Sequence, residues 1–223
     1  MRKLILILGS LLPGTTVLAQ TVYDSSFHFY YYDQKLSMFE TMEATPPEVV
    51  WLGDSITDGC EWNELFPGTF NLNRGISADN TFGVLNRLFE VIKRKPAKVL
   101  VMIGINDIAR GIPDTVILRN YQRIIDSFRI QTPDTRLFFQ SLLPTNNSFT
   151  DFKSHQNKTE HILFINSEMK KICSENNIGF INLHPHFTDP AGKLDARFTN
   201  DGLHLTGAGY QKWKEIILQG KYL

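Results

Sequence analysis

Short apolar segments alternate with longer helix-like segments along most of the chain. Residues 99–103 are continuously apolar, as expected of a strand buried on both faces of a parallel sheet. Strands joined through helices form βαβ units, whose crossovers are right-handed. The sequence therefore predicts an α/β fold built around a parallel sheet. The expected strands are 48–52, 70–73, 97–103, 136–142 and 179–183, and the expected helices are 30–42, 81–93, 113–130, 159–175 and 206–219.

Length and charge limit the class of protein. The 223 residues are enough to bury one full core, and the chain shows no internal repeat. Its 23 basic and 23 acidic residues give no formal net charge, whereas proteins that bind nucleic acid or anionic membranes usually carry a basic surface. We therefore expect a single domain over residues 20–223 and no nucleic-acid partner.

The N-terminus has the pattern of a secretory signal peptide. Arg2 and Lys3 precede the apolar run 4–12, and small residues lead up to Ala19. The apolar run is too short to span a bilayer, so we expect cleavage after Ala19, no membrane span in the mature chain, and a secreted or periplasmic protein. A buried N-terminal strand is the alternative. Export would permit a disulfide between Cys60 and Cys173, but the helical pattern around Cys173 favours a small buried side chain.

A serine follows the first predicted strand, and a carboxylate and an imidazole occur far downstream. Ser55 comes directly after the strand and Gly53-Asp54, so its hydroxyl is expected at the carboxyl edge of the sheet, where open α/β folds bind ligands. Asp201 and His204 are three residues apart, close enough for the carboxylate to orient the imidazole. These side chains supply the nucleophile, the base and the orienting acid of acyl-transfer catalysis.

Two further predicted strand ends carry candidate donors for an oxyanion. Gly75 follows the strand 70–73, and a glycine lets its backbone N–H approach a substrate closely. Asn106 follows the apolar strand 97–103 and can offer a side-chain N–H. With the backbone N–H of Ser55, these groups form a predicted oxyanion hole.

Together these blocks resemble the GDSL, or SGNH, hydrolase family, with Gly-Asp-Ser-Ile in place of Gly-Asp-Ser-Leu at residues 53–56. The resemblance covers about residues 48–219 and includes Ser55, Gly75, Asn106, Asp201 and His204 in order. It implies a three-layer α/β/α sandwich, flavodoxin-like, with a five-stranded parallel sheet and a shallow open site. It also implies neither cofactor nor metal. Residues 73–77 look most similar to exported bacterial acetylhydrolases and sialate O-acetylesterase-like enzymes.

Four other residues near the motifs are candidates for substrate contacts. They are Trp62, Arg74, Asp107 and Arg110. For Asp107 a structural role in a turn is the favoured alternative, and Asp54 and Asp58 are expected to cap the local helix. The polar segment 144–158 is the longest predicted loop and is expected to border the cleft.

The sequence thus predicts a serine esterase that acts on short acyl esters of small molecules or glycans, such as O-acetyl groups on carbohydrate. Three alternatives remain open. The first is a lysophospholipase or thioesterase, and the second is a non-catalytic binding module on the same scaffold. The third is a metal-dependent hydrolase with acidic residues and a histidine as ligands, namely Asp54, Asp58, Asp107, Asp201 and His204.

Overall fold

The computed structural model of the protein describes residues 27–223. The expected signal peptide, with its cleavage site after Ala19, lies outside the described residues. Among the described residues, no helix combines the length and apolar character needed to cross a bilayer.

A five-stranded parallel sheet forms the middle layer, in the order β2-β1-β3-β4-β5. The strand order reverses at β1, which lies between β2 and β3, so the loops after β1 and β3 diverge and leave room for a site there. This architecture confirms the predicted α/β fold. The strands are β1 (Val49–Gly53), β2 (Asn71–Gly75), β3 (Lys98–Met102), β4 (Arg136–Gln140) and β5 (Gly179–Ile181).

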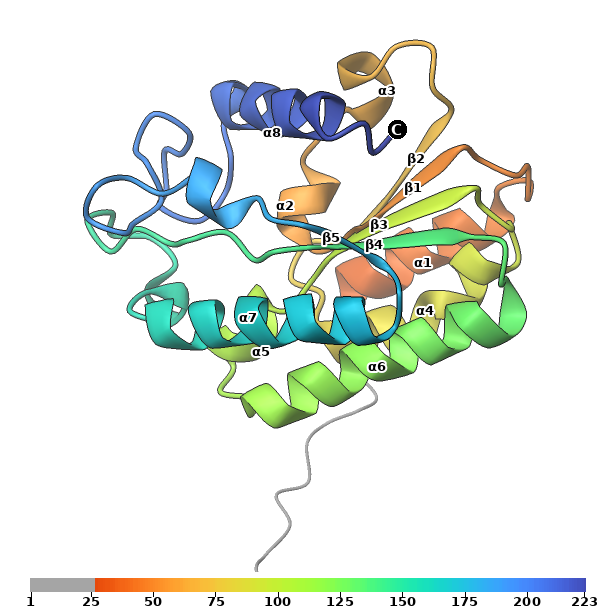
Figure 1. Ribbon diagram of the computed structural model, residues 1–223, viewed down its shortest axis with the longest axis horizontal. Coiled ribbons are helices and arrows are strands. Elements are labelled where there is room, and N and C mark those ends of the chain that lie inside the picture. Colours follow the sequence, from red (N-terminus) through yellow and green to blue (C-terminus); the bar gives the residue numbers. More distant parts are fainter. Residues whose placement is uncertain (1–26) are drawn as a thin grey trace, which may run out of the picture.

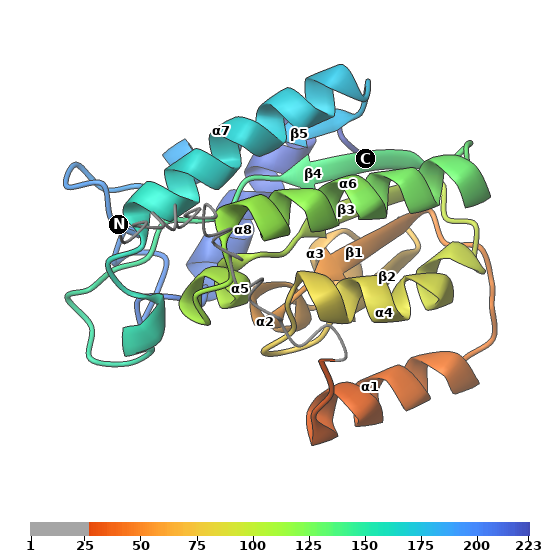
Figure 2. The same cartoon turned by 90° about the horizontal axis from the view of Figure 1, so that it is seen from below.

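Helices cover both faces of this sheet, which makes three layers (Figure 1). On one face lies α8 (Gly207–Gln219), with the short helices α2 (Ser55–Asp58) and α3 (Trp62–Leu65) beside it. The other face carries three longer helices in a row, α4, α6 and α7 (Figure 2). They span Thr81–Ile92, Asp114–Gln131 and Thr159–Glu175. Short turns of helix complete the chain: α5 (Ile105–Ala109), η1 (Lys153–His155) and η2 (His184–His186).

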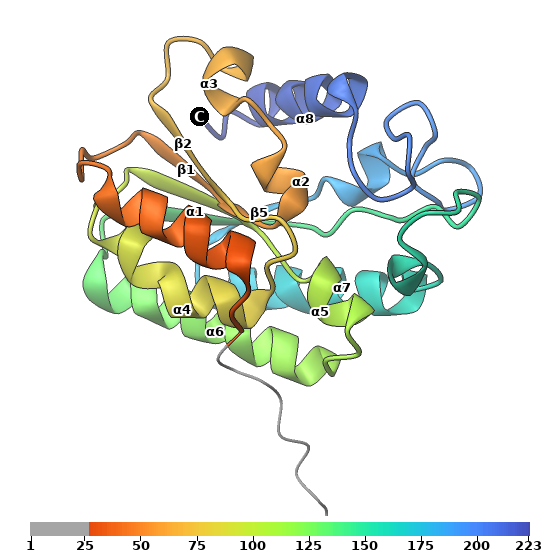
Figure 3. The same ribbon diagram turned by 180° about the vertical axis from the view of Figure 1, so that it is seen from behind.

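The first helix, α1 (Tyr30–Thr41), lies outside α4 rather than on the sheet itself (Figures 2 and 3). Its buried side chains Tyr32 and Phe39 pack with Ile76 in a small cluster of their own. The guanidinium of the buried Arg94 donates to the carbonyls of Phe39 and Glu43, at 2.8 and 2.6 Å. These contacts satisfy backbone carbonyls at the carboxyl end of α1.

The sequence located the five strands and the longer helices to within a few residues. It did not predict the helices α3 and α5, because helices of four or five residues are too short to show an apolar period. The two cysteines, Cys60 and Cys173, are both buried and unpaired. Burial raises the pKa of each thiol to about 12, so both behave as small apolar side chains.

Candidate active site

Ser55 is the first residue of α2 and follows the end of β1 almost directly. Asp54 occupies the N-cap position between them, and its Oδ1 accepts a hydrogen bond from the Ile56 N–H at 3.0 Å. This cap starts the helix within one residue of the strand. The turn therefore holds the Ser55 side chain at the carboxyl edge of the sheet, as the sequence predicted.

Ser55, His204 and Asp201 form a continuous chain of hydrogen bonds. The Ser55 Oγ lies 2.9 Å from His204 Nε2, and His204 Nδ1 lies 2.7 Å from Asp201 Oδ2. The other carboxylate oxygen, Oδ1, accepts from the backbone N–H groups of Leu203 and His204, both at 2.8 Å. Burial would raise the pKa of Asp201, but these hydrogen bonds outweigh it and hold that pKa below its ordinary value. Asp201 therefore remains a carboxylate and can orient the imidazole.

Two long loops bring the Asp201–His204 turn to Ser55. They run side by side at the left of Figure 1, the loop after β4 in green to teal and the loop before α8 in blue. The Asn146 N–H donates to the Gly202 carbonyl at 2.8 Å, and the Asn146 amide donates to the Leu194 carbonyl at 2.8 Å. A Cβ on Gly202 would lie 2.4 Å from the Asn146 carbonyl oxygen, and φ is +83° there, so only glycine fits.

Asn106 approaches the same edge of the sheet from the turn after β3. It lies in the first turn of α5, and only 7% of its surface is exposed. Its Nδ2 donates to the Asp79 carbonyl at 2.8 Å, and its Oδ1 lies 2.9 Å from His155 Nε2. An amide nitrogen carries two hydrogens, so one N–H of Asn106 remains available for a ligand.

The prediction for Gly75 as an oxyanion donor is wrong, because its N–H already donates to Asn73 Oδ1 at 2.9 Å. Gly75 is required for another reason: a Cβ there would lie 2.1 Å from the Asp58 backbone nitrogen, where β2 passes α2. The sequence-based prediction did not include the nearby Ala78 among the candidate donors. Its N–H makes no hydrogen bond to any of residues 27–223, and its neighbour Asp79 holds the Asn106 amide. Ala78 has φ +67°, a left-handed conformation that alanine rarely adopts. The sequence therefore shows no sign that the chain turns at this residue.

Three of the four predicted substrate contacts are buried in the protein and cannot meet a ligand. Trp62 stacks on Trp51, with ring centroids 3.6 Å apart. Arg74 pairs with Glu90 through an Nε–Oε2 contact of 3.0 Å. These assignments are therefore wrong.

The buried Asp107 accepts from the Thr81 backbone N–H and hydroxyl, the latter at 2.6 Å, and so holds the first residue of α4, whose N-cap is Asn80. The structure therefore supports the favoured alternative for Asp107, a structural role. Arg110 differs from the other three, because it is exposed and donates to the Ala78 carbonyl at 3.3 Å. It remains a candidate for substrate contact.

The loop 144–158 contributes two side chains that the sequence did not single out. Phe152 is 43% exposed, and its ring meets that of His204 edge-on at a centroid distance of 4.7 Å. His155 reaches Asn106, as described above. No periodicity marks either residue, so only the loop as a whole could be assigned to the border of the cleft.

Three carboxyl groups next to the site residues are buried, namely those of Asp54, Asp79 and Asp107. Burial is the main cause that raises their pKa values, to about 7, 6 and 7. The coulombic effect of Asp79 adds to the rise at both Asp54 and Asp107. Arg87 offsets part of it at Asp79, through an Nε–Oδ2 hydrogen bond of 2.9 Å.

The residues considered as metal ligands do not converge. Asp58 accepts hydrogen bonds from Tyr31 and Lys35 on α1, at 2.9 and 2.8 Å, while Asp54 caps α2 and Asp107 accepts from Thr81 at the start of α4. Within the described part of the chain, no three His, Cys, Asp or Glu side chains are grouped so as to hold a metal ion.

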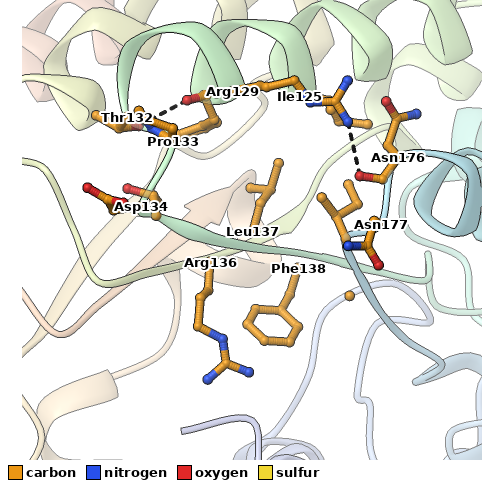
Figure 4. A pocket seen from close by; sticks show the side chains of 14 residues that line it. Ile125, Arg129, Thr132, Pro133, Asp134, Arg136, Leu137, Phe138, Asn176 and Asn177 are labelled. Atoms are coloured by element: carbon orange, nitrogen blue, oxygen red, sulfur yellow. Dashed lines mark hydrogen bonds between the residues drawn. The ribbon is translucent and has the colours of Figure 1, made fainter.

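Two of the hollows in the protein differ greatly in size and position. One, of about 520 Å³, lies at the amino ends of β4 and β5, between the end of α6 and the turn after α7 (Figure 4). It is at the opposite edge of the sheet from Ser55, and Arg129 and Asn176 lie in its wall, joined by a hydrogen bond of 3.0 Å. A small apolar hollow of about 10 Å³ lies next to Ser55 and His204 instead. Its lining includes the neighbours of Ser55, Asn106 and His204, namely Asp54, Ile56, Ile105 and Leu203.

Comparison with known proteins agrees with this geometry. Residues 51–212 match the model of the GDSL-like Lipase/Acylhydrolase family. The chain is 26% identical over 183 residues to platelet-activating factor acetylhydrolase IB subunit alpha2 of Homo sapiens, a match that covers 78% of this chain and 77% of the relative.

Solved structures share the fold. A GDSL-like lipase from Bacteroides thetaiotaomicron superposes with a TM-score of 0.74 at 23% identity, covering 86% of this chain and 98% of the other. An acetylxylan esterase from Geobacillus stearothermophilus superposes with a TM-score of 0.62 at 18% identity, covering 78% and 94%. The match to the family model spans most of the chain, and the strand order and the sequence motifs agree with it. The protein therefore belongs to the GDSL-like lipase/acylhydrolase family, the SGNH hydrolases, whose members hydrolyse esters.

Proposed function

We propose that this protein is a serine esterase that removes acetyl and other short acyl groups from carbohydrate hydroxyls. The observation that carries the proposal is the hydrogen-bonded chain from Ser55 through His204 to Asp201, at 2.9 and 2.7 Å. A serine hydroxyl is a weak nucleophile unless a base takes its proton as it attacks. His204 Nε2, which lies 2.9 Å from the Ser55 hydroxyl, is placed to act as that base.

The reaction follows in two half-reactions. The Ser55 oxygen bonds to the ester carbonyl carbon while its proton moves to His204 Nε2, and Asp201 stabilises the resulting imidazolium. His204 then returns the proton to the leaving alcohol as the ester C–O bond breaks. A water molecule attacks the acyl-enzyme in the same way, its proton passing through His204 to Ser55, and the free acid leaves.

The developing oxyanion needs donors that are not already occupied. The Asn106 amide retains one N–H after bonding Asp79, and the N–H groups of Ser55 and Ala78 have no partner within residues 27–223. We assign these three groups to the oxyanion hole, with Ala78 in the place predicted for Gly75. Each such donor contributes about 3 kcal/mol of transition-state stabilisation in comparable enzymes.

The space next to the nucleophile favours a short acyl group. The apolar hollow flanked by Ile56, Ile105 and Leu203 measures about 10 Å³, at most the room of one water molecule. It is too small for a long acyl chain, which would have to lie across the surface. This favours acetyl esters over the lysophospholipase and thioesterase alternatives.

The alcohol side of the site is open and has an aromatic wall. His204 protonates the leaving oxygen, so the alcohol must lie beside its ring, and the exposed Phe152 ring adjoins it at 4.7 Å. A flat apolar ring of this kind can pack against the C–H face of a sugar. The name of the human relative, a platelet-activating factor acetylhydrolase, favours a second candidate: an acetyl ester whose alcohol is a lipid.

A panel of esters separates these substrates. Acetate release would be followed for acetylated sialic acids, acetylated xylo-oligosaccharides and an acetylated glycerolipid, and acetyl and decanoyl p-nitrophenyl esters would be compared. We expect the sugar acetates to react fastest and the decanoyl ester to react slowest. Faster turnover of the decanoyl ester would contradict the acyl assignment, and faster turnover of the lipid acetate would contradict the carbohydrate assignment.

A further inference from the structure

His155 is the feature of the site that the proposed mechanism does not use. It closes the turn η1, and its Nε2 lies 2.9 Å from Asn106 Oδ1. The opposite end of the same amide, Nδ2, donates to the Asp79 carbonyl at 2.8 Å. A backbone carbonyl can only accept, so this contact settles which end of the amide is nitrogen. The Asn106 oxygen therefore faces His155.

This arrangement also determines the tautomer of His155. An amide oxygen accepts hydrogen bonds and cannot donate them, so Nε2 of His155 must carry the proton. In the neutral ring Nδ1 is then an acceptor, and the Ser154 hydroxyl lies 3.2 Å from it. Burial, His204 and Arg110 all lower the pKa of His155, which favours the neutral ring at neutral pH. A neutral ring adds no positive charge beside His204, which must itself become an imidazolium during turnover.

The loop holds His155 firmly in this position. Its backbone N–H donates to the Phe152 carbonyl at 2.9 Å, and its carbonyl accepts from the Thr145 hydroxyl at 3.2 Å. The left-handed backbone of Phe152, with φ +50°, begins the turn. The position of the His155 ring is thus set by the same loop that places Phe152 beside His204.

We propose that His155 is a positioning residue that clamps the Asn106 amide and strengthens its free N–H as an oxyanion donor. A hydrogen bond to the amide oxygen draws electron density toward that oxygen and makes the amide hydrogens more positive. Contacts at both ends also stop the amide from rotating, so that it needs no reorganisation when the oxyanion forms. The inference rests on the proposed esterase function, because it assigns His155 a role in that reaction.

A double-mutant cycle tests the coupling. Hydrolysis of p-nitrophenyl acetate would be measured for the wild type, His155→Ala, His155→Gln, Asn106→Ala and the double variant His155→Ala/Asn106→Ala. We expect His155→Ala to lower kcat about tenfold with KM nearly unchanged, as for loss of one hydrogen bond felt mainly in the transition state. His155→Gln, whose amide can still donate, should recover much of kcat. In the Asn106→Ala background, His155→Ala should have no further effect. Lys153→Ala, an exposed change in the same turn, should behave as the wild type.

The outcomes separate this inference from the proposed function. An equal loss from His155→Ala in both backgrounds, or a change confined to KM, would show that His155 does not act through Asn106. The ring tautomer can also be read by NMR of isotope-labelled protein, even if no ester is turned over. Protonation of His155 at Nε2 is expected, and protonation at Nδ1 alone would overturn the clamp. A wild type that is inactive toward every ester, with the Nε2–H tautomer present, would refute the esterase proposal instead.

Discussion

The Ser55 hydroxyl and the His204 imidazole are 149 positions apart in the chain and lie 2.9 Å from each other. Ser55 is positioned by the end of β1, and His204 by a loop that ends just before α8. The parallel sheet explains how they meet, because it gathers the carboxyl ends of all its strands at one edge. The candidate site is therefore formed by loops, and its chemistry can be tested one loop at a time.

Replacing Ser55 with alanine removes the attacking oxygen. We expect Ser55→Ala to lose measurable hydrolysis of p-nitrophenyl acetate and all labelling by a fluorophosphonate. Among the described side chains, no other hydroxyl is within hydrogen-bond distance of His204 Nε2. Its thermal unfolding should match that of the wild type. Ser127→Ala, on the exposed face of α6, serves as the matched control and should remain fully active. Activity retained in Ser55→Ala would end the serine mechanism.

Asp201→Asn should reverse the tautomer of His204. The oxygen of the new amide would stay on the Leu203 and His204 N–H groups, which leaves its NH₂ facing His204 Nδ1. The imidazole would then carry its proton on Nε2 and could not accept one from Ser55. In the corresponding serine-protease variant kcat falls about 10⁴-fold, and we expect a loss of this order. Asp195→Asn, in the same loop, is the control, and a loss below about tenfold would exclude Asp201 as the orienting acid.

Gly75→Ala and Ala78→Gly should affect stability differently. A Cβ at Gly75 would meet the Asp58 backbone at 2.1 Å, so we expect the free energy of unfolding to fall by about 2 kcal/mol or more. Ala78→Gly removes a Cβ from a left-handed backbone while it adds freedom to the unfolded chain, and these effects nearly cancel. It should stay active, because it keeps its N–H. Urea unfolding compares the two, and an undisturbed Gly75→Ala protein would contradict the close packing of β2 on α2.

The raised pKa of Asp54 predicts that the free energy of unfolding falls as the pH rises toward 8. Burial raises its pKa to about 7, with Asp79 and Asp107 adding to the rise, so the folded protein holds this proton more tightly than the unfolded chain. The stability that results is fully present below the ordinary pKa, near 4, and is lost as pH rises through about 7. Asp54→Asn imitates the protonated acid and keeps the cap to Ile56.

The free energy of unfolding in urea, measured from pH 5 to 8, should therefore fall less steeply in Asp54→Asn than in the wild type. A single group contributes at most about 1.4 kcal/mol per pH unit. The exposed change Asp134→Asn should leave the profile unaltered. An identical profile in the wild type and Asp54→Asn would show that Asp54 does not titrate in this range.

The sequence alone was sufficient for the order of strands and longer helices along the chain, and for singling out Ser55, Asp201 and His204, which the structure joins by hydrogen bonds. Buried strands and amphipathic helices leave apolar patterns in the chain, as residues 99–103 do, and these patterns are local. The motif around Ser55 and the spacing of Asp201 and His204 are local as well. Each could be recognised without knowing where the rest of the chain lies.

Only the tertiary structure decided which groups gather around Ser55 and His204. Gly75 and Trp62 lie close to the motifs in sequence, but one donates its N–H to Asn73 and the other packs against Trp51. Ala78, Phe152 and His155 carry no sequence signal, and they reach the site through an unusual φ angle or a loop conformation. Burial and hydrogen-bond occupancy arise from contacts between distant segments, and therefore a pattern of neighbouring residues cannot specify them.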